Sequence, residues 1–417
     1  MNQKIKYNHL LELLLGCFSI LLIPIHKQAV VVVMLLWLLV SLINFSIDCV
    51  KREFHFNKKY IPLLVFPVFY VVHLIGLIYT TNFDYAFFDL EIKLSMLLIP
   101  LALWLRSEIY IDKQKQIFRS LIFGSLISFG INLVRATIHY HDTADLGSFF
   151  YTGLSPIHPS YMALYISVAL LSIIYLGPRK IAFNLKYGKS IGIAMFVVLL
   201  GYLFLLSSKA GIITFTITII VFITAQYVRR VKPLHLIVII LMIGLIPAIL
   251  INSVPTIKGR FQAMITAIKN PSDASLDSNE SSMERIAILK TSTQFALKNL
   301  PWGVGTGDIK DEISENYKQL GSITINELYL NPHNQFLQTT ISLGILGLLS
   351  LLAILISGFR IAIKKKNVLF FSFVLLISLH FLFESMLEQQ AGVVFITLFY
   401  SLFCIWDGND LDSKETL

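Results

Sequence analysis

The sequence predicts an all-α, polytopic membrane protein with about 12 transmembrane helices and one large loop domain that contains amphipathic helices. Hydrophobic residues make up 56% of the chain and charged residues only 14%. The mean hydropathy of +0.73 is far above that of soluble proteins. A transmembrane helix needs roughly 20 apolar residues. Suitable segments cover residues 9–25, 28–47, 60–80, 88–105, 117–138, 158–176, 190–206, 211–228, 234–252, 335–359, 367–383 and 388–406.

The basic residues favour one orientation of these helices in the membrane. They cluster on alternate loops, around residues 51–59, 106–119, 179–189, 229–232 and 360–366. Because Lys and Arg are enriched on the cytoplasmic side, we expect both termini in the cytoplasm and the large loop outside. The net charge of +9 therefore reflects topology, and a nucleic-acid partner is not expected.

The long hydrophilic segment divides the chain into three parts. Residues 1–252 are expected to hold transmembrane helices 1–9, residues 253–332 the loop domain, and residues 333–417 helices 10–12 with a short cytoplasmic tail. The first four helices are rich in Leu, Ile, Val and Phe, and their prolines fall near helix ends, where a missing amide donor is tolerated. We expect these four helices to be scaffold.

The cysteines and acidic residues predict neither a disulfide nor a metal site. Cys17, Cys49 and Cys404 lie in or beside predicted spans, and the loop domain has no cysteine. No Asp, Glu, His or Cys cluster on the outer face has metal-ligand spacing. The sequence therefore predicts no metal and no other cofactor.

Two polar residues near the outer ends of helices five and six are candidates for lining a substrate site. Arg135 lies near the end of helix five, where Asp142 or Asp145 could instead pair with it. His158 precedes Pro159 in SPIHPSYMALY and could instead serve only to start helix six. The sequence leaves both alternatives open.

Lys209 lies in the tight outer turn LSSKAG between helices seven and eight. A lone lysine at a helix end usually extends towards lipid phosphates. Its position on the same face as the large loop also allows a role in binding substrate.

The loop domain is predicted to contain a linker followed by an amphipathic helix. Residues 270–282 are polar and rich in turn formers. From Met283 to Leu300, apolar residues recur at helical spacing, and Pro301 ends the pattern. This helix is expected to lie against the membrane or the helical bundle.

Arg285 is placed unusually for a basic residue, because it lies in the first turn of this helix, where the dipole does not favour a cation. That position suggests a specific partner, for which Glu280 and Glu284 are the ordinary candidates. Arg260 lies earlier in the same loop and is a further candidate for lining the site.

The glycine-rich turn WGVGTGD, residues 302–308, does not predict a nucleotide site, because no strand precedes it and no GK[ST] follows. We expect a flexible turn in which Asp308 caps the helix DIKDEISENYKQL, with Gly321 ending that helix.

His333 lies just before helix ten, at the positive end of its dipole, with Asn331 and Asn334 beside it. A histidine there could take a proton from a sugar hydroxyl, and nearby cations would keep it neutral. A base combined with cations suits glycosyl transfer from a diphosphate donor. A histidine that only starts the helix is the alternative.

The stretches SSKAG, ERIAILKTSTQFALKNLPWGVGTGD and NPHNQFLQTTISLGILGLL together resemble the O-antigen ligase and polymerase family of bacterial envelope glycosyltransferases. The resemblance spans about residues 207–348, whereas the first half of the chain agrees only in its many-helix plan. Family members move a finished glycan from an undecaprenyl diphosphate carrier to an acceptor on the periplasmic face, without a metal.

The resemblance implies a role for three residues. His333 corresponds to the family's essential histidine, the base that acts on the acceptor hydroxyl. Arg285 matches the loop arginine, and Lys209 stands where many members have arginine in S-R-G or S-R-A. Both cations would bind the donor diphosphate, although lysine lacks the bidentate geometry of arginine.

By this resemblance we expect an O-antigen ligase of the bacterial inner membrane, which attaches an undecaprenyl diphosphate-linked glycan to a lipid A-core sugar in lipopolysaccharide biosynthesis. A polymerase that joins lipid-linked repeats would share the same base and cations. A flippase or transporter is a third class. It would be expected to have similar halves and charged residues buried near the bilayer midplane, and the sequence shows neither.

Overall fold

The computed structural model describes residues 3–50, 58–228, 231–273, 281–319 and 331–406. Within these ranges the chain is helical and contains no strand. The helices, in order, are α1 (Gln3–Leu22), α2 (Lys27–Val50), η1 (Lys58–Leu64), α3 (Val65–Ile75), η2 (Gly76–Tyr79), α4 (Phe83–Lys93), α5 (Ser95–Leu105), α6 (Ser107–Tyr110), α7 (Gln114–Thr143), η3 (Leu146–Phe149), η4 (Tyr151–Leu154), α8 (Pro159–Leu176), α9 (Pro178–Ile181), α10 (Gly188–Leu205), α11 (Lys209–Tyr227), α12 (Pro233–Ser253), α13 (Pro255–Lys269), η5 (Pro271–Asp273), α14 (Ser281–Lys298), α15 (Ile309–Gln319), α16 (Gln335–Lys364), α17 (Val368–Phe381), η7 (Met386–Glu388) and α18 (Gln390–Ile405).

The helices agree with the predicted membrane-protein class, but not every predicted span is one long helix. Eight helices in the described part of the chain are long and apolar enough to cross a bilayer, and three further apolar helices are shorter. The predicted span 88–105 is divided at Leu94 into α4 and α5. The count of 12 spans and the domain boundaries at residues 252 and 332 therefore stay predictions.

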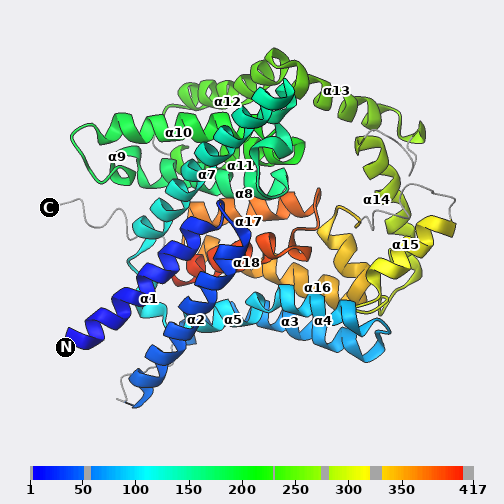
Figure 1. Cartoon of the computed structure of the whole chain (residues 1–417), viewed down its shortest axis with the longest axis horizontal. Helices are drawn as coiled ribbons and strands as arrows, with labels where there is room; N and C mark the ends of the chain where they lie inside the picture. The colour runs from blue at the N-terminus through cyan, green and yellow to red at the C-terminus, as the bar shows by residue number, and fades with distance from the viewer. Residues whose placement is uncertain (1–2, 51–57, 229–230, 274–280, 320–330, 407–417) are drawn as a thin grey trace.

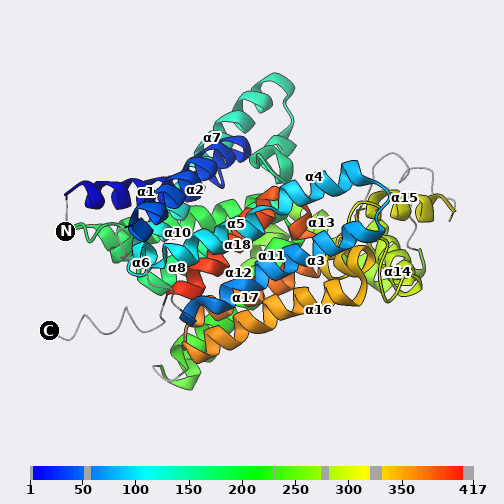
Figure 2. The ribbon, with the colours of Figure 1, turned by 90° about the horizontal axis from the view of Figure 1, so that it is seen from below.

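Burial distinguishes the central helices from those at the edge. Of the most apolar part of α8, 89% is buried, whereas the corresponding figure for α12 is 6%. Both helices are apolar on all sides, so one faces other helices and the other is available to lipid. Figures 1 and 2 show α14 and α15 together at one end of the molecule, and α3 beside α16.

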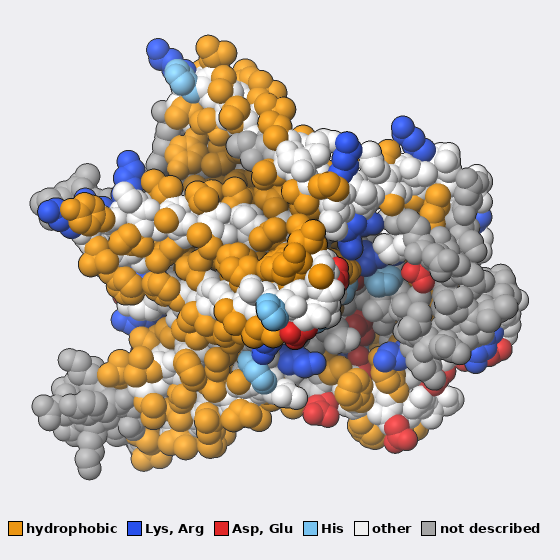
Figure 3. Space-filling model, turned by 45° about the horizontal axis from the view of Figure 1, so that its top comes forward, with side chains coloured by type: hydrophobic (Ala, Val, Ile, Leu, Met, Phe, Trp, Pro, Cys, Tyr) orange, Lys and Arg blue, Asp and Glu red, His pale blue; other side chains and the backbone are white. Residues whose placement is uncertain are grey.

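The surface is divided into a hydrophobic part and a part that carries the acidic side chains. In Figure 3, hydrophobic side chains cover the left and centre of the view, whereas the acidic side chains visible there lie in its right half. Wide exposure of large apolar side chains, such as Leu241 at 65% and Val32 at 60%, is expected of a surface in contact with lipid.

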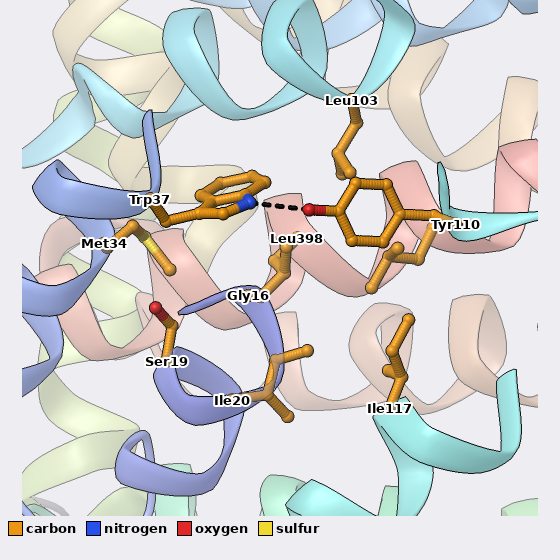
Figure 4. A pocket seen from close by; sticks show the side chains of 10 residues that line it. Gly16, Ser19, Ile20, Met34, Trp37, Leu103, Tyr110, Ile117 and Leu398 are labelled. Carbon is orange, nitrogen blue, oxygen red and sulfur yellow. Dashed lines mark hydrogen bonds between the residues drawn. The ribbon is translucent and has the colours of Figure 1, made fainter. Parts of the chain in front are cut away.

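A small cavity lies between the N-terminal helices and α18 (Figure 4). Trp37 Nε1 donates a hydrogen bond to the Tyr110 hydroxyl over 2.7 Å across this region. The cavity has a volume of about 10 Å³ and apolar walls, which is too small and too apolar for an ordered water. It is a packing gap, not a ligand site.

Charged side chains are buried inside the bundle, contrary to the sequence expectation. The Lys93 ammonium is paired with the carboxylates of Asp89 and Glu388, the latter at 3.0 Å. Arg106 binds Glu12 over 3.1 Å and also pairs with Asp48. Each cluster joins helices distant in sequence, and its members are paired as buried charges must be.

Candidate active site

A pocket of about 220 Å³ brings together three residues that the sequence singled out. Lys209 is the first residue of α11, Arg285 lies near the start of α14, and His333 lies just before α16. More than 120 residues separate Lys209 from His333 in the sequence. Folding therefore brings these residues together around one pocket. The pocket is lined by Lys209, Ala210, Ile213, Met264, Ile268, Ser282, Arg285, Ile286, Leu289, Pro332, His333, Leu382 and Phe383.

Glu384, which sequence reasoning missed, links two of these residues. Its Oε1 lies 2.8 Å from Arg285 Nη2, and its Oε2 lies 3.1 Å from His333 Nδ1. The side chain is only 7% exposed, whereas those of Arg285 and His333 are 32% and 22% exposed. Glu384 is therefore a partner of Arg285 that the sequence did not predict, and Glu280, one of the predicted candidates, lies outside the described residues.

The Glu384 carboxylate is held in its ionised form. Burial raises its pKa, but the hydrogen bond with His333 and the positive charge of Arg285 outweigh burial and lower the pKa from 4.5 to about 2. A third hydrogen bond comes from Ser160 Oγ, 3.3 Å from Oε1. Near neutral pH this buried group is an anion with three partners.

The ionised carboxylate fixes the tautomer of the neutral His333 ring. A carboxylate can only accept hydrogen bonds, so Nδ1 of His333 carries the proton directed at Glu384. In the neutral imidazole, Nε2 then has a free lone pair and can accept a proton. The backbone of His333 is held as well, because its N–H donates to Asn331 Oδ1 at 2.9 Å.

Lys209 directs its ammonium into the pocket. Its Nζ donates to Ser282 Oγ over 2.5 Å, which links α11 to the start of α14. Ser208 caps α11 by accepting from the Gly211 N–H, and its hydroxyl lies 3.4 Å from that of Ser160. The cap of α11 is thus connected to the Glu384 carboxylate through the Ser160 hydroxyl, which lies within hydrogen-bonding distance of both.

The other four candidate residues are distributed around the pocket or away from it. Asn334 caps α16 through the Leu337 N–H and also donates to the Leu382 carbonyl, so its role in the fold is structural. His158 caps α8, as the helix-start alternative predicted. Arg135 is exposed on α7 and does not line the pocket.

Arg260 lies on α13 with its guanidinium carbon 3.8 Å from the centre of the Tyr151 ring. It does not line the pocket itself. It lies one helical turn before Met264, which does line the pocket, and therefore on the same face of α13.

The helix predicted from Met283 is present as α14, and its apolar residues pack in two directions. Phe295 and Ala296 are buried in a second apolar core with residues of α15 and α16. Ile286 and Leu289 instead line the pocket. Most of the predicted linker 270–282 and the predicted helix end at Gly321 lie outside the described residues.

The turn at residues 302–308 was expected to be flexible, but it is hydrogen-bonded to α16. The N–H groups of Val304 and Gly305 donate to the carbonyls of Ile341 and Ser342 over 2.8 and 2.9 Å, just before the break in α16 at Gly344. The carboxylate of Asp308 accepts hydrogen bonds from Thr81 and Asn82 and does not serve as the expected helix cap.

Fold and site together define a polytopic helical membrane protein with a histidine and two cations around one partly apolar pocket. A buried carboxylate binds the histidine and one of the cations. In the comparison with protein families, residues 194–352 match the family described as O-antigen ligase. The match confirms the resemblance to the O-antigen ligase and polymerase family. Lys209, Arg285 and His333 fall inside the matched range, whereas Glu384 lies beyond its end.

No curated protein matches the chain at a significant level. Among the described residues, no group of three or more His, Cys, Asp or Glu side chains could hold a metal ion.

Proposed function

We propose that this protein is an O-antigen ligase, which transfers a glycan from undecaprenyl diphosphate to a lipid A-core sugar on the periplasmic face of the bacterial inner membrane, with both termini in the cytoplasm. The observation that carries the proposal is the placement of His333, Arg285 and Lys209 around one pocket. A base and two cations are what this transfer requires, and the family match agrees with it.

In the proposed reaction, His333 is the general base. Its Nε2 takes the proton of the acceptor hydroxyl as the oxygen attacks the anomeric carbon of the donor. The new C–O bond forms on the face opposite the departing diphosphate, so the anomeric configuration is inverted. Glu384, hydrogen-bonded to Nδ1 at 3.1 Å, stabilises the imidazolium that results.

Arg285 and Lys209 bind the donor diphosphate. As the anomeric bond breaks, negative charge grows on the leaving diphosphate, and two cations in a partly desolvated pocket stabilise this state more than the ground state. The bond between Arg285 and Glu384 leaves other guanidinium N–H donors for phosphate, because arginine has five. No metal is needed to neutralise the leaving group in this scheme.

The apolar wall of the pocket suits the isoprenoid end of the donor. Ile213 of α11, Met264 of α13, Ile286 of α14 and Phe383 after α17 all line it beside the charged residues. A lipid diphosphate has the same combination of an apolar chain and a charged head group. Burial of each CH₂ group contributes about 0.8 kcal/mol.

The deciding experiment uses the purified protein in lipid nanodiscs with an undecaprenyl diphosphate-linked glycan. Lipid A-core and a second lipid-linked repeat are offered separately as acceptors. A ligase transfers only to lipid A-core, whereas transfer to the repeat would identify a polymerase. Movement of the glycan across vesicles without a covalent product would instead favour a transporter.

His333→Ala should abolish transfer in this assay while leaving the protein folded and inserted, because the side chain is assigned to proton abstraction and is not packed in the core. Size-exclusion chromatography and melting temperature serve as folding controls. Near-normal transfer by this variant would remove His333 from the mechanism.

A further inference from the structure

A second polar group lies beside the pocket and has no part in the reaction described above. It consists of Arg260, Tyr151 and His158. The Arg260 guanidinium lies over the Tyr151 ring at 3.8 Å, and the Tyr151 hydroxyl is 3.3 Å from His158 Nε2. The ring of His158 meets that of Tyr151 edge-on, with centres 6.1 Å apart.

This group is connected to the pocket at both of its ends. At one end, His158 caps α8, and in the first turn of that helix Ser160 donates to Glu384 Oε1 over 3.3 Å. At the other end, Arg260 precedes the pocket-lining Met264 by one turn of α13. The three residues therefore lie next to Met264, which lines the pocket, and to Ser160, which binds Glu384.

The charge of Arg260 is not neutralised by a carboxylate among the residues that the structure describes. Its contact there is the face of Tyr151, and its Nε is shielded from solvent with no hydrogen-bond partner. Arg285 differs, because it is bound to Glu384. A guanidinium held flat against an aromatic ring keeps its charge and its planar donors for an anionic ligand.

The position of the group relates it to one of the two substrates of the proposed reaction. The donor's diphosphate is assigned to Lys209 and Arg285, and its lipid to the apolar wall. The acceptor must reach Nε2 of His333 from outside that space. Arg260 and Tyr151 do not line the pocket, but they are joined to Glu384 through His158 and Ser160.

We propose that Arg260, Tyr151 and His158 form the acceptor subsite, and that it takes a saccharide bearing a phosphate near the hydroxyl that is glycosylated. Arg260 binds the anionic group, Tyr151 holds the guanidinium plane in place, and His158 holds the Tyr151 hydroxyl through its Nε2. This inference rests on the proposed function, since it names the acceptor class of the same site.

Equilibrium binding tests the subsite without any transfer. The probe is core oligosaccharide released from lipopolysaccharide, used with its phosphates and after chemical dephosphorylation, against the full-length protein in nanodiscs. The phosphorylated probe should bind wild type roughly tenfold more tightly than it binds Arg260→Ala, in line with the loss of one charge-assisted contact. Dephosphorylation should weaken binding to wild type by a similar factor and leave binding to Arg260→Ala unchanged.

Matched variants separate a binding role from a structural one. Lys258→Ala removes a charge from the same helix at a position that does not line the pocket, and it should bind like wild type. Tyr151→Phe keeps the ring under Arg260 and should retain the preference for the phosphorylated probe. If Arg260→Ala still prefers the phosphorylated probe as wild type does, or if wild type shows no preference, the subsite is wrong.

The transfer assay gives a second and separate readout. With lipid A-core as acceptor, Arg260→Ala should raise the KM for the acceptor about tenfold, while the KM for the donor stays unchanged. A rise in the donor KM instead would overturn the assignment to the acceptor. Wild type that binds the probe but transfers no glycan would refute the proposed function and leave the subsite standing.

Discussion

At the scale of single residues, Glu384 holds the side chains of Arg285 and His333 in position. It accepts from Arg285 and from His333 with different oxygens, at 2.8 and 3.1 Å. One anion thus fixes the tautomer of the proposed base and the orientation of the cation that we propose binds phosphate. Removing its charge should disturb the chemical step more than the binding of the donor.

Glu384→Gln preserves the size of the side chain but removes its charge. The amide can donate to Nδ1, which favours the tautomer with the proton on Nε2, so we expect kcat to fall roughly a hundredfold. Initial rates of transfer measure this. Glu312→Gln, at an exposed position of α15, is the control and should be neutral; equal rates for the two variants would contradict the role of Glu384.

The same variant has a predicted pH signature. The pKa of Glu384 falls from 4.5 to about 2 in the folded protein, so its ionised form stabilises the fold above pH 4.5, and this stabilisation is lost as the pH falls towards 2. The difference in melting temperature between wild type and Glu384→Gln should therefore be constant above about pH 5 and should shrink in acid. If this difference in melting temperature grew in acid, it would contradict a lowered pKa of Glu384.

Lys209 tests whether the pocket needs charge alone or the geometry of arginine. Lys209→Arg should retain activity, Lys209→Ala should slow transfer about ten- to a hundredfold through the loss of a charge-assisted contact, and Lys209→Glu should be inactive. Lys290→Ala, exposed on α14 outside the pocket, is the matched control. Wild-type rates in Lys209→Glu would remove the lysine from the proposed donor site.

The sequence could predict His333, Arg285 and Lys209 because each lies in a recognisable local motif and all were expected on one face. Glu384 belongs to the short connection ESMLE, which carries no motif. Its one signal was an acidic residue on an outer loop, at the same membrane level as two predicted cations. Which loop meets which depends on helix packing, and local sequence does not encode that.

At the scale of elements, the break in α16 is where the loop region meets the helical bundle. Gly344 has φ 61° and ψ −149°, outside the helical region, and the Ile345 N–H donates to the Pro301 carbonyl over 2.9 Å. A Cβ at position 344 would overlap that carbonyl oxygen. The sequence SLGILGLL reads as uninterrupted apolar helix, so periodicity could not reveal this break.

Gly344→Ala should therefore detach the turn 302–308 from α16. Backbone strain alone costs about 1–3 kcal/mol, and the overlap adds to it, so the melting temperature and the transfer rate should both fall. Gly130→Ala is the matched control, because nothing lies within 4 Å of a Cβ there on α7, and it should be neutral or slightly stabilising. Unchanged melting of Gly344→Ala would mean that the docked turn does not support the fold.

At the scale of the whole molecule, the composition predicted a helical membrane protein. Helix packing determined which helices and which charged side chains are buried. Apolar segments predicted helices, but they did not distinguish the buried α8 from the exposed α12, because both are apolar on all sides. Nor did they predict that Lys93 would be buried with Asp89 and Glu388. Such pairs depend on which helices become neighbours, and that is a property of the assembled bundle.

The orientation in the membrane is the remaining whole-molecule prediction, and the site depends on it. Basic loops predict that the α9 region is cytoplasmic and that α14 is periplasmic. After replacement of Cys17, Cys49 and Cys404 by serine, single cysteines are introduced at Thr293 on α14 and at Asn184 beside α9, both of which are exposed. In intact cells with a permeable outer membrane, an impermeant maleimide should label Thr293→Cys, whereas Asn184→Cys should react only after the inner membrane is opened. Retained transfer activity in both variants shows that they are folded. Labelling in the opposite order would place the pocket on the cytoplasmic face, where neither the donor glycan nor the acceptor of the proposed reaction is present.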